Sequence, residues 1–192
     1  MEKEGTGSAI IKSIVLGILA IIVVLGLFLL FTRNKKTPVE DNYQITVVDE
    51  ITTVNLDKNY PADPRKVVDL YAKTMQVLYR ENYSNDQQDK MIAVLKGIMD
   101  DEFLSVNPNM EQSVKKEVRD RKEGGYSISA YVVQGKDPEE VKVGEDKMCS
   151  VDCLFSLRHG TNGTVANYYQ FILRKDSEGK WKILGWTIKE DE

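Results

Sequence analysis

Hydrophobic residues follow three different patterns along this chain of 192 residues. Residues 13–31 read SIVLGILAIIVVLGLFLLF and contain no charged side chain. Between residues 63 and 122 apolar residues recur every three or four positions, which predicts amphipathic helices. From residue 126 to residue 189 they alternate with polar residues, which predicts strands. The order of the patterns predicts a membrane-spanning helix, then helices, then a sheet.

The first apolar segment predicts a transmembrane helix at residues 13–32, after a short tail at residues 1–12. Nineteen helical residues span roughly 28 Å, close to the ~30 Å thickness of the hydrocarbon core. The competing interpretation is a cleaved signal peptide, whose apolar core is normally about 7–15 residues and ends in a small-residue cleavage site. Here the core is longer and is followed by TRNKK. We therefore expect an uncleaved, single-pass anchor.

The charges that flank the anchor are nearly balanced. Lys3 and Lys12 precede it with the terminal amine, and Arg33, Lys35 and Lys36 follow it, so the positive-inside rule alone does not set the orientation. However, long domains translocate largely regardless of charge, and an N-terminal anchor before a lone folded domain is the usual signal-anchor layout. We therefore expect an extracytoplasmic domain on the cell membrane.

Three helices are predicted at the start of the soluble domain, residues 61–192. The first begins at Asp63-Pro64, because Asp caps free amide groups and Pro is favoured at the first helical position. The second begins after a capping box at Ser84 and extends through Met99, with further apolar residues beyond it. The third covers about residues 110–122 and is mostly charged. Residues 33–60 are predicted to be a tether that contains a short extended segment.

About four antiparallel strands are predicted after the helices. The first covers residues 126–134, and the second begins near Val141 or Lys147. The third covers residues 164–175 and the fourth residues 181–189. In the second, alternation places five apolar residues toward the core: Cys149, Val151, Cys153, Phe155 and Leu157. The predicted fold class is α+β, with three helices packed on one face of a curved sheet.

Two segments carry a resemblance to a known fold. NYPADPRKVVDLYAKTMQVLY and YYQFILRKDSEGKWKILGWTI resemble the first helix and the final hairpin of the nuclear transport factor 2-like fold, in which helices close a bent sheet into a cone. The anchor joined to such a domain resembles an uncharacterised family of bacterial, clostridial-type membrane proteins. The resemblance implies a bacterial cell surface location, and it implies no specific function because this fold hosts many functions.

The charge balance argues against nucleic acid as a partner. Without residues 1–36, the chain keeps 21 basic and 28 acidic residues, a net charge of −7. Such a surface repels phosphate backbones. The predicted partners are the membrane, through the anchor, and one or more proteins.

The cysteines and the single histidine predict no metal site and no cofactor. Cys149 and Cys153 lie four residues apart on one strand, roughly 13 Å, which is too far for a disulfide. Zinc would need further ligands, and His159 is the only histidine. We interpret the cysteines as small buried hydrophobic residues and His159 as a solvated turn residue. Asp152 is predicted to face solvent, and no residue is predicted to be catalytic.

Aromatic residues provide the one argument for a pocket. Five of them are candidates to line the open end of a cone and hold an apolar ligand or a peptide: Tyr71, Tyr79, Tyr169, Phe171 and Trp186. The alternative is that they are ordinary core residues.

Three functions remain open on this basis. The favoured one is a surface-anchored binding or scaffold module. The second is a bitopic subunit of an envelope or conjugative secretion assembly, which the anchor-plus-cone layout resembles. The third is a small-molecule dehydratase or isomerase, for which the sequence supplies no acid–base pair.

Overall fold

The computed structural model describes residues 45–189. The predicted tail, the transmembrane helix at residues 13–32 and the tether as far as residue 44 lie outside the described residues. None of the helices between residues 45 and 189 combines the length and the hydrophobicity needed to cross a membrane.

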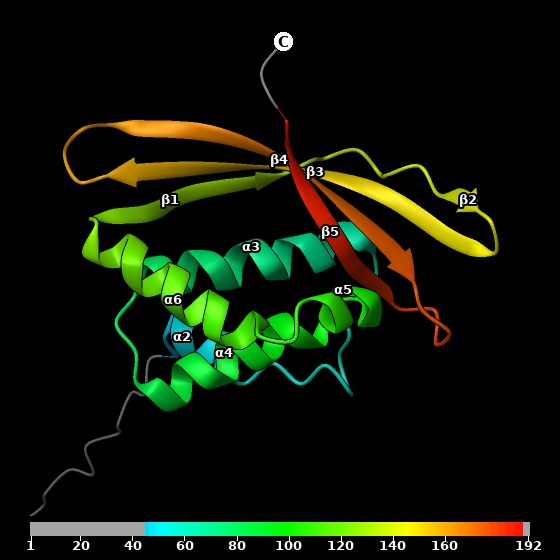
Figure 1. The fold of residues 1–192 in the computed structure, drawn as a ribbon, viewed down its shortest axis with the longest axis horizontal. Coiled ribbons are helices and arrows are strands. Elements are labelled where there is room, and N and C mark those ends of the chain that lie inside the picture. The colour runs from blue at the N-terminus through cyan, green and yellow to red at the C-terminus, as the bar shows by residue number, and fades with distance from the viewer. Residues whose placement is uncertain (1–44, 190–192) are drawn as a thin grey trace, which may run out of the picture. The chain divides into compact units, whose positions relative to one another are not determined.

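The described residues form a layer of helices on one face of an antiparallel sheet (Figure 1). The helices are α2 (Val47–Thr52), α3 (Pro64–Arg80), α4 (Asn85–Gly97), α5 (Asp101–Val106) and α6 (Met110–Glu123). The strands are β1 (Tyr126–Val133), β2 (Val141–Val143), β3 (Asp146–His159), β4 (Thr164–Lys175) and β5 (Trp181–Lys189). The predicted α+β class is confirmed, and residues 45–189 contain five strands in place of about four and five helices in place of three.

The sheet has the order β1-β3-β4-β5, and the short strand β2 also pairs with β3. Register shifts between Ile128 and Ala130 in β1 and between Ile172 and Leu173 in β4 interrupt the pairing. Such irregularities increase the local bend of a strand. The sheet is therefore bent at two places, one in the β1–β3 pairing and one in the β4–β5 pairing.

Helix α3 is the central element between the sheet and the other helices (Figure 1). Asp63 caps its first turn by accepting a hydrogen bond from the Lys66 amide at 3.0 Å, and Pro64 occupies the first helical position, as predicted. Val67, Val68 and Leu78 are fully buried. Each such side chain contributes about 1.5–3 kcal/mol through burial, so α3 holds the two layers together.

The extended segment predicted within residues 45–54 is wrong, because this part of the chain forms helix α2. Thr46 and Asp49 make a reciprocal capping box at its start. Val48 and Ile51, three residues apart, therefore point to the same side and are buried in the core. The β-branched residues that suggested a strand are outweighed by the cap and by this tertiary packing. The folded unit thus begins within the range predicted as tether.

The second predicted helix is also shorter than expected. Its capping box at Ser84 is confirmed, but α4 ends at Gly97 and a separate helix, α5, follows. Between them, the Asp100 amide donates to the Ile183 carbonyl and the Ile183 amide donates to the Ile98 carbonyl, both at 2.9 Å. Pairing with strand β5 satisfies these backbone groups outside a helix, which explains why buried Ile98 and Met99 are not helical.

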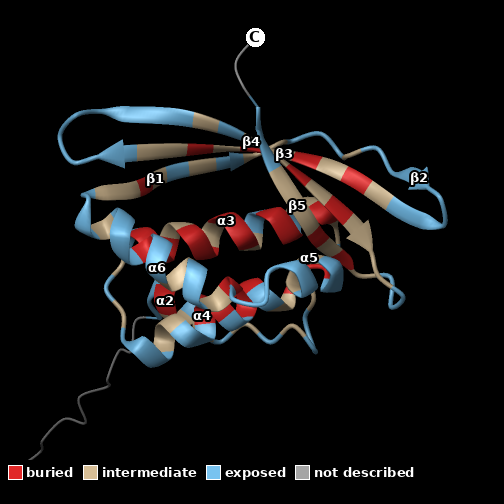
Figure 2. Ribbon diagram, in the orientation of Figure 1, coloured by how far each residue is buried: buried red, intermediate tan, exposed pale blue. Residues whose placement is uncertain are grey.

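The predicted core face of β3 is largely confirmed. Cys149, Val151, Cys153 and Phe155 are buried, and Leu157 is partly buried against them (Figure 2). Both cysteines are free and buried, as predicted. The third helix, α6, is exposed along most of its length and is anchored by buried Met110 and Val118.

Candidate functional site

The five aromatic residues selected from the sequence come together around one half-open cavity of about 130 Å³. Tyr71 and Tyr79 come from α3, Tyr169 and Phe171 from β4, and Trp186 from β5. The remaining lining residues are Met75, Glu117, Arg121, Ile128, Phe155 and Leu157. The structure thus places all five candidates at one site, between α3, α6 and the inner face of the sheet.

The aromatic rings form a continuous wall. The centroids of Tyr71 and Phe171 lie 5.1 Å apart in an edge-to-face arrangement, and those of Tyr71 and Trp186 lie 5.4 Å apart. Phe155 meets Tyr169 edge to face at 5.4 Å. These separations fall in the range of favourable aromatic pairs, so the rings hold one another in place.

The Tyr71 ring is buried and its hydroxyl opens onto the cavity. The residue is 8% exposed and lines the cavity, and its hydroxyl makes no hydrogen bond to any described residue. The hydroxyl oxygen is not among the buried side-chain atoms that lack a partner, so water reaches it. Burial, together with the nearby Glu117, raises the pKa of Tyr71 well above its ordinary value. The group is therefore a neutral donor and acceptor directed at the cavity.

Two charged residues of α6 stand at the rim. The Tyr79 hydroxyl donates to the Glu117 carboxylate at 2.6 Å. Burial and this hydrogen bond raise the pKa of Tyr79. Arg121 lies one helical turn beyond Glu117 and its guanidinium carbon sits 5.3 Å from the centre of the Tyr126 ring.

Sequence reasoning missed Glu117 and Arg121 because the segment that forms α6 is mostly charged and has few apolar positions. Both residues are indeed exposed. The available signal was their spacing of four, which places them on one face of a helix together with neighbouring Val114 and Val118. That spacing alone did not distinguish a rim from a solvated surface.

The other residues considered from the sequence lie elsewhere. Burial raises the pKa of Cys149 and of Cys153 to about 12, so both thiols stay protonated. His159 is exposed and its ring stacks on Tyr126 with centroids 4.2 Å apart. Asp152 pairs with Lys189 at 2.7 Å on the outer face of the sheet.

Within residues 45–189, no group of three or more His, Cys, Asp and Glu side chains is arranged to hold a metal ion. The cavity instead offers rings, tyrosine hydroxyls and one charge of each sign.

Comparison with known proteins gives a family for the chain. The model of the family described as "Domain of unknown function (DUF6715)" matches residues 1–186. No curated protein matches the chain.

Several solved structures share a limited likeness. CagV, a VirB8 homolog of the T4SS from Helicobacter pylori strain 26695, is 12% identical, with 66% of this chain and 99% of that chain covered at a TM-score of 0.39. The intermembrane space region of the chloroplast protein ARC6 is 12% identical, with coverages of 68% and 99% and a TM-score of 0.35. A de novo β-sheet design is 17% identical, with coverages of 66% and 87% and a TM-score of 0.31. Such low scores define neither a shared topology nor a shared function.

Proposed function

This chain belongs to the DUF6715 family, whose description assigns no activity, and we propose that it is a membrane-anchored module that binds a small ligand in its aromatic cavity. The observation that carries the proposal is the Tyr71 hydroxyl, which makes no hydrogen bond to a described residue and is open to a half-open cavity. Water can satisfy this hydroxyl, and a ligand that enters the cavity can take over the hydrogen bond.

The anchor and the location are part of the same proposal. The nineteen uncharged residues at positions 13–31 support a single membrane-spanning helix. We place the folded domain on the extracytoplasmic side of a bacterial cell membrane, as the signal-anchor layout favours. We further propose that the helices and the bulged strands form a nuclear transport factor 2-like cone whose open end is the cavity.

A binding role fits the cavity better than catalysis. Burial raises the pKa of both Tyr71 and Tyr79, so these hydroxyls stay neutral and are poor proton donors near neutral pH. Glu117 already accepts the Tyr79 hydroxyl hydrogen bond. A dehydratase or isomerase needs an acid and a base placed on either side of its substrate, and this arrangement supplies one exposed carboxylate.

A subunit of an envelope or secretion assembly is the second candidate, and one surface feature favours it. Val132, Leu154 and Tyr168 are paired across β1, β3 and β4 and form an apolar row on the outer face of the sheet. Val132 is 60% and Tyr168 44% exposed. Exposed rows of this kind mark protein contacts. Pull-down of the full chain with and without Tyr168→Glu tests this role, and repeated absence of any stable complex argues against it.

The binding proposal is tested with phenol, a neutral ring with one hydroxyl. A cavity of this size holds about one aromatic ring. We expect calorimetry on the full chain in maltoside detergent to detect binding, and Leu157→Phe, which fills the cavity, to weaken it at least about tenfold. Leu154→Phe is the matched control, because Leu154 lies on the same strand with the opposite parity. Absence of phenol binding, or equal affinity in the two variants, contradicts the proposal.

A further inference from the structure

The charged rim and the aromatic wall together indicate which ligand the cavity prefers. We propose that it selects a small organic ammonium ion, with the alkylated nitrogen held among Tyr71, Phe171, Tyr169 and Trp186 and facing Glu117. The inference rests on the proposed binding function and adds a chemical class to it.

The first support is the ring arrangement. Tyr71, Phe171 and Trp186 contact one another pairwise, with centroids 5.1, 5.4 and 5.8 Å apart. Tyr169 adds a fourth ring 6.5 Å from Phe171. The rings pack on one another edge to face or tilted, so together they form one aromatic wall of the cavity. A cation in the cavity is attracted to the electron-rich faces of the rings that line it.

The second support is the sign of the local charge. The Glu117 carboxylate accepts a hydrogen bond at 2.6 Å from Tyr79, which lines the cavity. The Arg121 guanidinium also reaches the rim, but its central carbon lies over the ring of Tyr126, which is not a lining residue. The carboxylate is thus tied to the cavity wall while the guanidinium is drawn to a ring outside it, which favours a cation in the cavity.

The third support is size. A dry cavity of about 150 Å³ accommodates one benzene molecule. The observed cavity, about 130 Å³, therefore has room for a compact head such as trimethylammonium and not for a large ring system. Its half-open form leaves the rest of such a ligand in solvent.

Two kinds of molecule carry such an ammonium head: a free metabolite such as choline, and a phospholipid with a phosphatidylcholine headgroup. The test uses both kinds of molecule with the full chain in maltoside detergent, which carries no ammonium group. Calorimetric titrations compare choline, its neutral isostere 3,3-dimethylbutan-1-ol, and monomeric dihexanoylphosphatidylcholine. We expect choline to bind at least about tenfold more tightly than the isostere.

Binding of choline alone identifies a free ligand, and equal or tighter binding of the phospholipid identifies a headgroup. Both outcomes support the proposal. Equal affinity for choline and its isostere overturns the cation preference while leaving the cavity as a binding site. Binding of phenol with no binding of choline also overturns the cation preference and leaves the cavity as a binding site. Failure of every probe overturns the binding function as well.

Variants of opposite sign separate charge recognition from general damage. Glu117→Gln keeps an oxygen for the Tyr79 hydroxyl and removes the charge, so we expect choline affinity to fall about tenfold with little change for the isostere. Arg121→Gln should strengthen choline binding. Glu123→Gln, at the exposed end of the same helix, is the control and should leave both affinities unchanged. Parallel losses in Glu117→Gln and Arg121→Gln contradict the proposal.

Discussion

Arg174 and Asp100 form a two-pronged ion pair that joins the sheet to the helical layer. The Arg174 Nε donates to one oxygen of Asp100 at 3.0 Å, and a terminal guanidinium nitrogen donates to the other. The Asp100 side chain is 6% exposed and that of Arg174 is 23% exposed. Asp100 also caps α5 by accepting a bond from the Glu102 amide. One carboxylate therefore fixes the start of a helix to strand β4.

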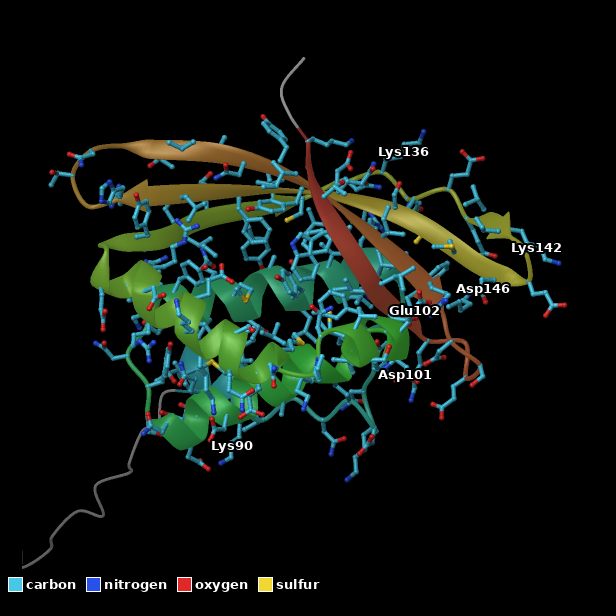
Figure 3. All side chains as sticks on the ribbon, viewed as in Figure 1. Lys90, Asp101, Glu102, Lys136, Lys142 and Asp146 are labelled. Carbon is cyan, nitrogen blue, oxygen red and sulfur yellow. The ribbon has the colours of Figure 1, made fainter. Side chains whose placement is uncertain are left out.

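The same arginine gathers two more carboxylates at the end of the sheet. Arg174 bonds to Glu102 of α5 at 3.0 Å and to Asp146 at the start of β3 at 3.5 Å, and the labelled Glu102 and Asp146 lie at the same end of the domain (Figure 3). The hydrogen bond from Arg174 to Asp100 raises the pKa of the guanidinium further above its ordinary value, so it stays charged.

Removing this arginine should strongly destabilise the domain. Arg174→Met leaves the buried Asp100 carboxylate without its cation, and breaking a buried pair in this way costs about 3 kcal/mol. Urea denaturation of the full chain measures the loss. Asp120→Asn, which breaks the exposed Lys116–Asp120 pair, is the control and should have no measurable effect. Equal effects of the two substitutions would mean that the Arg174 pair has no special role.

Helix α2 should contribute to stability as part of the folded domain. Ile51 is 1% exposed, so Ile51→Ala should lower the free energy of unfolding by about 2–4 kcal/mol. Val47→Ala, on the exposed side of the same helix, should change it little. If both variants unfold like the unchanged chain, α2 belongs to a tether after all.

The buried thiols predict a dependence on alkaline pH. Burial raises the pKa of Cys149 and Cys153 from 9.0 to about 12, because the thiolate is disfavoured away from water. The folded state then holds protons that the unfolded state releases, so the stabilisation is complete below pH 9 and is lost as the pH rises toward 12. Thiol-reagent kinetics at pH 8 should show both cysteines unreactive until the domain is unfolded. Rapid labelling of the native chain would show that the thiols are accessible.

The protected cysteines make the orientation of the chain measurable. A Ser177→Cys variant adds an accessible thiol in the exposed turn between β4 and β5, whereas neighbouring Asp176 must be kept because its carboxylate accepts bonds from the Glu178 and Lys180 amides. We expect an impermeant maleimide to label this variant on intact cells. Labelling that appears only after lysis would place the domain on the cytoplasmic side.

Local patterns were enough to predict much of this fold. The caps at Asp63 and Ser84 and the alternation in β3 act within a few residues, and the corresponding elements were predicted well. The break after Gly97 depends on pairing with Ile183, far along the chain, so no local pattern could indicate it. Helix α2 did carry a local signal, the Thr46–Asp49 capping box, which its β-branched residues masked. The aromatic lining of the cavity could be predicted from residue type. The charged rim could not, because Glu117 is linked to the cavity only through its hydrogen bond with Tyr79, which lies on another helix.

The effect of Tyr71→Phe on stability and on phenol affinity, measured together, tests the binding cavity most directly. If the hydroxyl serves a ligand, its removal should leave the free energy of unfolding nearly unchanged, since no described residue bonds to it and the oxygen is open to water. The same change should weaken phenol binding about three- to tenfold, the equivalent of one hydrogen bond. A clear loss of stability with unchanged phenol affinity would show that Tyr71 is an ordinary core residue and would contradict the account.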